Sequence, residues 1–370
     1  MDEKITLVSD IQNLIKSKLK DIDEFNAIWK QQENIHPEKF LRELKDLSTV
    51  QSVGSSTRIE GSSLSDEEVK DLIANLDINK LTGRDSQEVI GYYEALDLIF
   101  ENFDLIFLTE AYIKQLHFVL LKHSSKDICH HGKYKSLSNK VVAKYSDGTN
   151  KVIFNTTEPY LVSKEMEELL CWTNARLANN MVHPLIVVSA FVYEFLSIHP
   201  FQDGNGRLSR LLTNLLMIKL GYSFIRYISF EHVIEERKKE YYQNLMECQR
   251  HRYCPEENIS RWILFFLDAV EDTIFKLQTK LNAVDKLSLN RNLSRNQLQI
   301  LDLIQASQGL NFIEIHEKLS EIPVQTIKSA LARLVEQNLI HRNGRGRGTW
   351  YTAFSNNYYS SARPDRQPQE

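Results

Sequence analysis

The feature that most constrains the fold is a polar stretch at residues 199–210, HPFQDGNGRLSR, which separates two hydrophobic segments. Residues 184–198 are apolar on nearly every side, as expected of a helix buried at the centre of a domain. After the polar stretch, leucines recur at helical spacing until Gly221 ends the pattern (Leu208, Leu211, Leu212, Leu215 and Leu216). The sequence therefore predicts a tight polar loop that joins two deeply packed helices.

This loop has the composition of an anion-binding site. Gly204, Asn205 and Gly206 can adopt left-handed backbone angles and direct their N–H groups to one point, where the positive end of the next helix also lies. Arg207 and Arg210 are three residues apart, so they share a helix face and can offer forked donors to the same anion. We therefore expect the loop to hold a phosphate group.

Two further side chains of the loop suggest catalysis. Asp203 offers one carboxylate oxygen, the usual protein share in a Mg²⁺ site that water and nucleotide phosphates complete. His199, at the end of the preceding helix, has the side chain best suited to accept a proton near neutral pH. The alternative is an ordinary helix–loop–helix corner with a capping Asp and two solvated arginines. The convergence of anion donors, metal ligand and base favours an active site.

The stretch also resembles the signature of Fic-domain proteins, His-x-Phe-x-(Asp/Glu)-Gly-Asn-Gly-Arg-x-x-Arg. All eight specified positions are met, by His199, Phe201, Asp203, Gly204, Asn205, Gly206, Arg207 and Arg210. The similarity extends over about residues 50 to 275, and its fully specific part is confined to residues 199–210. It implies a protein adenylyltransferase, which transfers AMP from ATP, with Mg²⁺, to a Ser, Thr or Tyr hydroxyl of a target protein.

The resemblance also implies roles for the loop residues. His199 would deprotonate the target hydroxyl, Asp203 would hold Mg²⁺, and residues 204–207 with Arg210 would bind the phosphates of the nucleotide. Two alternatives remain open: a nucleotide-sensing, DNA-binding regulator, and a hydrolase that removes AMP from a modified protein at the same site. Self-modification and a homodimer are also compatible with the sequence.

A glutamate upstream of the loop has an unfavourable local position. Ser65 and Glu68 form a capping-box pattern that starts one helix, and Gly61 is typical of the residue that ends the helix before it. Glu60 is then in a last helical turn, where the helix dipole disfavours a carboxylate by up to about 1 kcal/mol. A carboxylate in such a position can indicate that it pairs with a residue elsewhere in the fold, although a solvated glutamate near a turn is the ordinary alternative.

The segment Ser56-x-x-x-Glu60-Gly61 resembles the inhibitory motif that some Fic proteins carry before the catalytic domain. The resemblance implies that Glu60 pairs with Arg210 and blocks the position of the ATP γ-phosphate.

Residues 139–145 and 151–154 have strand-like composition and flank an Asp-Gly turn signal, which predicts a β-hairpin. Its open edge could accept an extended target segment by strand addition. The hairpin resembles the Fic flap, here residues 133–155, which clamps the target backbone and also touches nucleotide; Val141 is the flap residue assigned to that contact. A hairpin without a binding role is the alternative.

Residues 235–245 are expected to form a charged helix that presents Tyr241 and Tyr242. Packing of these aromatic rings in the core is the usual interpretation. The family resemblance implies that Tyr241 or Tyr242 lines the adenine pocket, with Gln249 as a further candidate.

A second unit begins near residue 291. Three helical segments, the first with a capping box at Ser294 and Gln297, precede two β segments at 339–341 and 349–352. This order resembles a winged helix, in which the hairpin could touch phosphates. Residues 291–353 carry eight Lys or Arg and five Asp or Glu, a net charge of +3. Both DNA and a protein therefore remain open as its partner.

The predicted fold is mainly α. We expect N-terminal helices over 1–68 with the inhibitory motif at 56–61, and a Fic-type catalytic domain over 69–275 with one hairpin flap. These are followed by the end of a linker helix at 276–290, a winged-helix-like domain over 291–354 and a disordered polar tail over 355–370.

Composition and charge argue against a secreted protein, a membrane-spanning protein and a chain that is basic throughout. The net charge of −4 gives no whole-chain signal for nucleic acid or an anionic membrane. The polar start lacks the apolar core of a signal peptide, and no run of eighteen apolar residues occurs. The four widely spaced cysteines are expected to be reduced thiols. A cytoplasmic protein without membrane contact is therefore expected.

Overall fold

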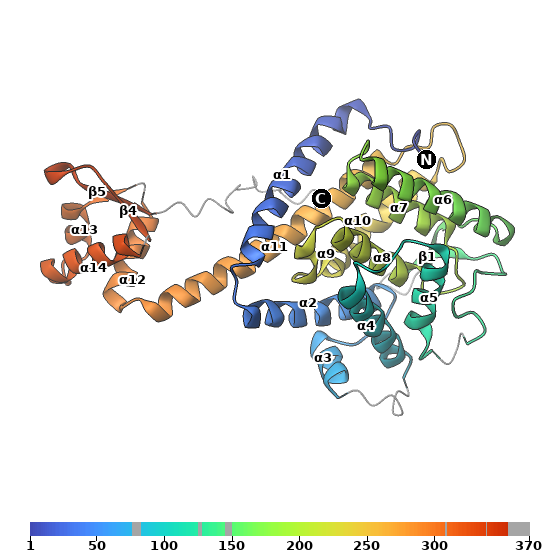
Figure 1. Ribbon diagram of the computed structural model, residues 1–370, viewed down its shortest axis with the longest axis horizontal. Coiled ribbons are helices and arrows are strands. Elements are labelled where there is room, and N and C mark those ends of the chain that lie inside the picture. Colours follow the sequence, from blue (N-terminus) through green and yellow to red (C-terminus); the bar gives the residue numbers. More distant parts are fainter. Residues whose placement is uncertain (76–82, 125–127, 145–149, 308, 338, 354–370) are drawn as a thin grey trace. The chain divides into compact units, whose positions relative to one another are not determined.

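A computed structural model of the protein describes residues 1–75, 83–124, 128–144, 150–307, 309–337 and 339–353. The chain divides into two compact units, Met1–Leu277 and Gln278–Glu370. Helices dominate both units, so the mainly α fold is confirmed (Figure 1). Within the described residues, no helix is both long enough and apolar enough to cross a membrane.

The first unit begins with α1 (Ser9–Glu33) and α2 (Glu38–Ile59), which are separated by a short break that contains His36 and Pro37. The next helix, α3 (Asp66–Ala74), starts with the predicted capping box of Ser65 and Glu68. Glu60 is the C-cap of α2, and Gly61 follows it with φ of +108°. The glycine is needed there because this backbone conformation is strained for other residues. Glu60 therefore occupies the helix end that the sequence predicts.

The centre of this unit is α7 (Pro184–Ile198), in which every residue from Leu185 to Ile198 is buried. It packs against α6 (Pro159–Asn179) and against α8 (Asn205–Lys219), whose leucine stripe is also buried. The helices α4 (Arg84–Asn102) and α5 (Glu110–Leu121) both contact α8 as well. The polar loop is thus held between two of the most deeply packed helices of the unit.

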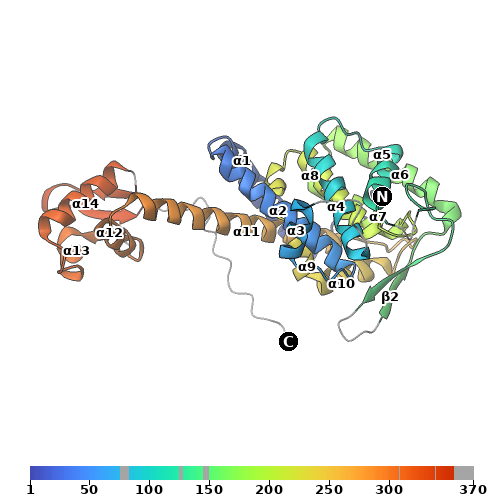
Figure 2. The ribbon, with the colours of Figure 1, turned by 90° about the horizontal axis from the view of Figure 1, so that it is seen from below.

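The predicted hairpin is present as β1 (Lys140–Lys144) and β2 (Asn150–Asn155), paired antiparallel with an irregularity between Val141 and Val142. Figure 2 shows it extending from the helices of the first unit. Its expected turn, residues 145–149, lies outside the described residues.

The expected single helix over 235–245 is wrong in one respect. A short helix, α9 (Phe230–Glu236), follows the 3₁₀ turn η2 (Ser223–Arg226), and α10 (Lys238–Gln249) begins only after a break at Arg237. The Arg237 guanidinium donates to Asp272 at 2.9 Å and covers the Phe265 ring, and both partners lie on α11. Tertiary contacts with α11 thus accompany a break that helical periodicity alone does not reveal. The helix α11 (Ser260–Asn292) ends two residues beyond the linker-helix end expected at residue 290.

The second unit has the expected winged-helix order. It contains α12 (Arg295–Gln305), α13 (Phe312–Lys318), α14 (Val324–Glu336), β4 (Ile340–Asn343), the 3₁₀ turn η3 (Gly346–Gly348) and β5 (Trp350–Ala353). A strand that the sequence analysis missed, β3 (Leu310–Asn311), completes an antiparallel sheet of order β3-β5-β4. The expected tail, residues 355–370, lies outside the described residues.

Candidate active site

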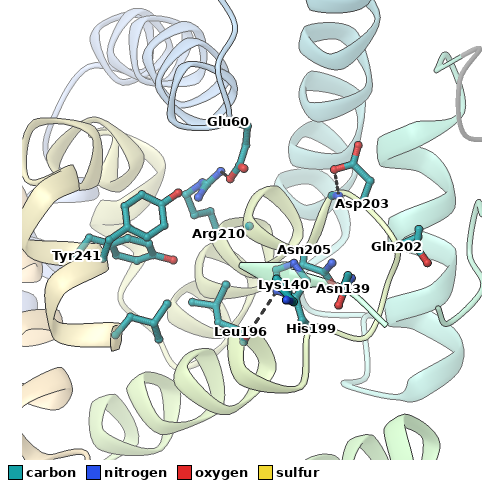
Figure 3. A pocket seen from close by; sticks show the side chains of 14 residues that line it. Glu60, Asn139, Lys140, Leu196, His199, Gln202, Asp203, Asn205, Arg210 and Tyr241 are labelled. Carbon is teal, nitrogen blue, oxygen red and sulfur yellow. Dashed lines mark hydrogen bonds and ion pairs between the residues drawn. The ribbon is translucent and has the colours of Figure 1, made fainter. Parts of the chain in front are cut away.

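A cavity of about 220 Å³ opens beside the polar loop. Five parts of the chain line it: the end of α2, the base of the hairpin, the end of α7, the loop with the start of α8, and α10 (Figure 3). The lining residues from these parts are Glu60, Asn139, Lys140, Leu196, His199, Gln202, Asp203, Gly204, Asn205, Gly206, Arg210, Tyr241, Tyr242 and Leu245. The structure therefore brings most of the predicted site residues together around one space.

His199 is the C-cap of α7 and has a left-handed backbone with φ of +52°. Such a conformation is uncommon for a residue other than glycine, and it turns the side chain out of the helix. Nδ1 lies 3.2 Å from the carbonyl oxygen of Leu196, so Nδ1 carries the proton that is donated. Burial, assisted by the positive charge of Lys135, lowers the pKa of His199 to about 4. The ring is therefore neutral at pH 7, with its lone pair on Nε2.

Asn205 braces the loop from within. Its side-chain oxygen accepts from the Phe201 N–H at 2.9 Å, and its side-chain nitrogen donates to the Phe201 carbonyl at 2.7 Å. Asn205 is 1% exposed, so both bonds are sheltered from water. Both ends of the amide thus hold the loop in its turn, and Asn205 also lines the cavity.

The loop ends at the N-terminus of α8, where an anion is stabilised by the helix dipole and by N–H groups without intrahelical acceptors. Gly204 precedes the helix with φ of +80°. A Cβ atom on Gly206 would collide with Oε1 of Glu60. The carboxylate of Glu60 therefore lies directly over the first turn of α8, where an anionic ligand would bind.

Glu60 is held there by Arg210. Nη2 of Arg210 donates to Oε1 of Glu60 at 2.7 Å, and the same guanidinium donates to Oγ and to the carbonyl of Ser56 at 2.8 and 2.9 Å. The Arg210 side chain is 4% exposed and that of Glu60 is 29% exposed. Burial alone would raise the pKa of Glu60, but the charges of Arg210 and Arg207 outweigh it and lower the pKa. The pair is therefore charged at neutral pH.

Charged contacts from a distant part of the chain fix the end of α2 that carries Glu60. Arg58 pairs with Glu235 of α9 at 2.7 Å and with Asp66 at 2.9 Å. The Lys238 ammonium donates to the carbonyl oxygen of Ile59 at 2.7 Å. The end of α2 that carries Glu60 is thus held by ion pairs with α3 and α9 and by a hydrogen bond from α10.

Asp203 has the properties of a single protein ligand to Mg²⁺. Its side chain is 43% exposed and lines the cavity, and Oδ1 accepts from the Gly204 N–H at 2.7 Å. Burial raises its pKa, but Arg207 and the Gly204 N–H lower it further than burial raises it, so the carboxylate stays charged. The described residues contain no group of three or more His, Cys, Asp or Glu that could hold a metal alone. A Mg²⁺ ion at Asp203 would therefore need phosphate and water ligands.

The two arginines of the loop have different partners, which differs from the expectation that both face one anion. Arg207 is 1% exposed, pairs with Glu88 of α4 at 3.1 Å, and lies 3.5 Å from Asp203. It is not among the residues that line the cavity, whereas Arg210 is. The nearer carboxylate partner of Arg207 is that of Glu88, which is 7% exposed.

Tyr241 and Tyr242 both line the cavity, and their rings meet edge to face with centroids 5.1 Å apart. Burial raises the pKa of Tyr241 to about 12, so its hydroxyl stays protonated. Gln249 is buried away from the lining and donates to Ser197 of α7, as a core residue would. Val141 is paired with Phe154 in the hairpin, and its side chain lies outside the described residues.

A histidine of α5 that was not predicted from the sequence also supports the loop. Nδ1 of His117 accepts from the Gly132 N–H at 2.9 Å, which leaves the proton on Nε2, 3.0 Å from the Asp203 carbonyl. The ring stacks on Phe201 with centroids 3.8 Å apart, and burial lowers the pKa of His117 to about 4. Its one sequence signal is a lone polar residue on the apolar face of a helix.

Comparisons with known proteins agree with this geometry. Residues 107–217 match the model of the Fic/DOC family, and residues 293–362 match the model of the penicillinase repressors. The protein adenylyltransferase Fic of Drosophila mojavensis is 30% identical over 109 residues, which are 30% of this chain and 19% of that protein. The same protein of Aedes aegypti is 29% identical over 109 residues, with the same coverage. The chain thus spans about a fifth of the length of the curated relatives it matches.

Solved structures show the same fold. A Fic family protein from Desulfovibrio desulfuricans G20 aligns with a TM-score of 0.57 and 21% identity, over 95% of this chain and 98% of that one. A fragment of Fic-1 from C. elegans aligns with a TM-score of 0.54 and 20% identity, over 73% of this chain and 74% of that one. The chain therefore carries a Fic domain, matched over residues 107–217, and a second domain similar to the penicillinase repressors over residues 293–362.

Proposed function

We propose that this protein is an adenylyltransferase that moves AMP from ATP to a Ser, Thr or Tyr hydroxyl of a protein. The observation that carries the proposal is the convergence on one cavity of a neutral His199, the N-terminus of α8 and the Asp203 carboxylate. The matched relatives are named as protein adenylyltransferases, which agrees with this chemistry.

In this mechanism the target hydroxyl oxygen attacks the α-phosphorus of ATP, and its proton passes to Nε2 of His199. A new oxygen–phosphorus bond forms, the bond to the β-phosphate oxygen breaks, and pyrophosphate leaves. The backbone N–H groups at the start of α8 face the phosphates. Bound Mg²⁺ at Asp203 would supply positive charge that neutralises the leaving pyrophosphate. The rate then depends mainly on positioning and charge stabilisation.

The hairpin supports a protein as acceptor. Within the described residues, β1 and β2 form a two-stranded sheet, so each strand keeps one edge without a strand partner in that sheet. An extended segment of the target could pair with such an edge and bring its hydroxyl to the cavity, which the first hairpin residue, Lys140, lines.

We further propose that Glu60 inhibits the enzyme. Its carboxylate lies over the first turn of α8 and engages Arg210, so it takes both the space and the donor that a terminal phosphate needs. ATP would then bind with its α-phosphate out of line for attack. Ser56 supports this arrangement because it receives two hydrogen bonds from the same guanidinium.

The direct test is label transfer from ATP to protein. With the α-phosphate labelled, the full-length protein should transfer label to itself or to a protein in a lysate, and with the γ-phosphate labelled it should not. Transfer from the γ-phosphate would identify a kinase and overturn the proposal. Release of label from an already modified target, without net transfer, would favour the hydrolase instead.

A second candidate function, DNA binding, rests on the winged helix. Four basic side chains of this unit are exposed: Lys328 and Arg333 of α14, Arg342 of β4, and Arg345 just before η3. The unit also matches the penicillinase-repressor model. If these residues contact phosphates, the full chain with Arg342→Ala and Arg345→Ala should bind all DNA sequences more weakly, with a salt slope reduced by about two. No DNA retardation by the wild type at low salt would indicate a protein partner instead.

A further inference from the structure

A buried lysine beneath the hairpin has no part in the proposed chemistry. Lys135 is 3% exposed, and its Nζ donates to three oxygens: Oδ1 of Asn139 at 2.9 Å, Oγ1 of Thr156 at 2.7 Å and the carbonyl of Ile198 at 3.1 Å. An ammonium has three protons, so these three acceptors use all of them. None of the three is a carboxylate, and burial of a cation among neutral oxygens is costly.

The three acceptors connect separate parts of the site. Asn139 directly precedes β1, Thr156 directly follows β2, and Ile198 directly precedes His199. The hydroxyl of Thr156 also lies 2.6 Å from Oδ1 of Asn139. Lys135 therefore closes the base of the hairpin and joins it to the end of α7.

The same group of residues holds the backbone on both sides of His199. The backbone N–H of Lys135 donates to the Pro200 carbonyl at 2.8 Å, and the side-chain nitrogen of Asn139 donates to the Phe201 carbonyl at 3.0 Å. With the bond to Ile198, the carbonyls of residues 198, 200 and 201 are all fixed. His199 has a left-handed backbone that needs such support, because the surrounding structure must over-determine it.

We propose that Lys135 is a positioning residue that fixes the hairpin relative to His199, so that the surface that receives the target and the base that takes its proton keep one geometry. This inference rests on the proposed transfer reaction. Lys135 does not line the cavity, so its effect on transfer would pass through His199 and the hairpin and not through contact with ATP.

The charge of Lys135 is sensitive to pH within a measurable range. Burial lowers the pKa of Lys135 to about 8. The negative charges of Glu158 and Glu165 act against this shift, and the positive charge of Arg252 adds to it. A neutral amine has two protons, so above that pH one of the three oxygens loses its donor. The transfer rate of the wild type should therefore fall above about pH 8, and Lys135→Met should lack this alkaline fall.

The main test compares Lys135→Met with Lys164→Met, a matched change at an exposed lysine of α6 that lies outside the hairpin and the cavity lining. We expect Lys135→Met to lower kcat for protein modification by about 10- to 100-fold, the scale of a misplacement of about 1 Å, with little change in KM for ATP. Lys164→Met should behave as wild type. Equal kcat values for the two variants would overturn the proposal.

A second readout does not depend on any transfer activity. The positive charge of Lys135 helps to lower the pKa of His199, so an NMR titration of His199 should show a higher pKa in Lys135→Met and no change in Lys164→Met. An unchanged His199 pKa in folded Lys135→Met would overturn the proposed coupling. If the wild type transfers no AMP, the proposed function fails while this titration still tests the geometry.

If Lys135→Met does not fold, Thr156→Val tests the positioning role of Lys135 instead, because valine has the shape of threonine without the hydroxyl. It removes one of the three acceptors, so we expect a smaller loss of kcat, about 3- to 10-fold. A folded Thr156→Val with wild-type kcat would count against the network.

Discussion

The two sides of the cavity are held by different kinds of contact. On one side, the loop wall (residues 199–206), neutral groups bond to backbone atoms, as Asn205 does with Phe201 and His117 with Asp203. On the other, the α2 wall (the end of α2 with Glu60), charged side chains pair across the fold, as Arg58 does with Glu235. Neutral buried bonds set a fixed geometry, whereas partly exposed ion pairs weaken with salt and can be displaced by another anion. From this difference we expect the loop wall to carry out the proposed transfer and the α2 wall to regulate its rate.

The largest effect should come from the loop wall at His199. His199→Ala removes the base, so we expect transfer to fall by about 10²- to 10⁴-fold while Mg·ATP binding stays nearly normal. Label transfer and calorimetric ATP binding on the same preparation check both parts. Near-normal transfer would remove His199 from the mechanism.

A change at Asn205 tests whether the loop wall acts through geometry. Asn205→Ala deletes both buried bonds to Phe201, so we expect transfer to fall by about 10²-fold, as for a misplaced reactive group. Asn244→Ala is the matched control, because Asn244 bonds to a carbonyl four residues earlier on an exposed helix face. Equal transfer by the two variants would show that the loop does not need this brace.

The α2 wall should respond in the opposite direction. Arg58→Met breaks the pairs with Glu235 and Asp66 and loosens the end of α2 without altering the cavity lining, so we expect transfer to rise by about 3- to 10-fold. Arg42→Met is the control, since Arg42 forms an exposed pair with Glu38 on the same helix. A fall in transfer for Arg58→Met would mean that the α2 wall supports catalysis instead of restraining it.

Acid should weaken the loop wall through His117. Its pKa in the folded protein is about 4 against 6.5 for an ordinary histidine, so the unfolded chain binds the extra proton first. Stability is then lost as the pH falls from 6.5 to 4, by about 3 kcal/mol for this residue. Denaturant unfolding across this range should show the loss, and His117→Gln should reduce it. The same change at the exposed His251 should not, and an identical loss in all three proteins would contradict the assignment.

The loop wall could be predicted from sequence because its information is local. The run from His199 to Arg210, the apolar helix before it and the leucine stripe after it define two packed helices and the turn between them. The position of Glu60 at a helix end also followed from nearby caps. Its contact with Arg210, 150 residues away, was implied only by the family resemblance.

The parts that could not be predicted depend on long-range contacts. His117 lies 86 residues before Asp203, and Lys135 lies 63 residues before Ile198, so no spacing rule connects them to the loop. Glu88, which pairs with Arg207, is further still from its partner in the sequence. The strand β3, of two residues, is too short for any periodicity to reveal.

The central claim is that the α2 wall restrains the loop wall through one carboxylate. It is tested most directly by the initial rate of α-phosphate transfer at saturating Mg·ATP, measured for wild type and Glu60→Gly, with Glu67→Gly as an exposed control on the next helix. Glu60→Gly frees Arg210 and the first turn of α8, so we expect a rate about 10- to 100-fold above wild type, and no rise for Glu67→Gly. Arg210→Ala should not raise the rate, because it removes the phosphate donor together with the inhibitory pair. Equal rates for wild type and Glu60→Gly would contradict the account.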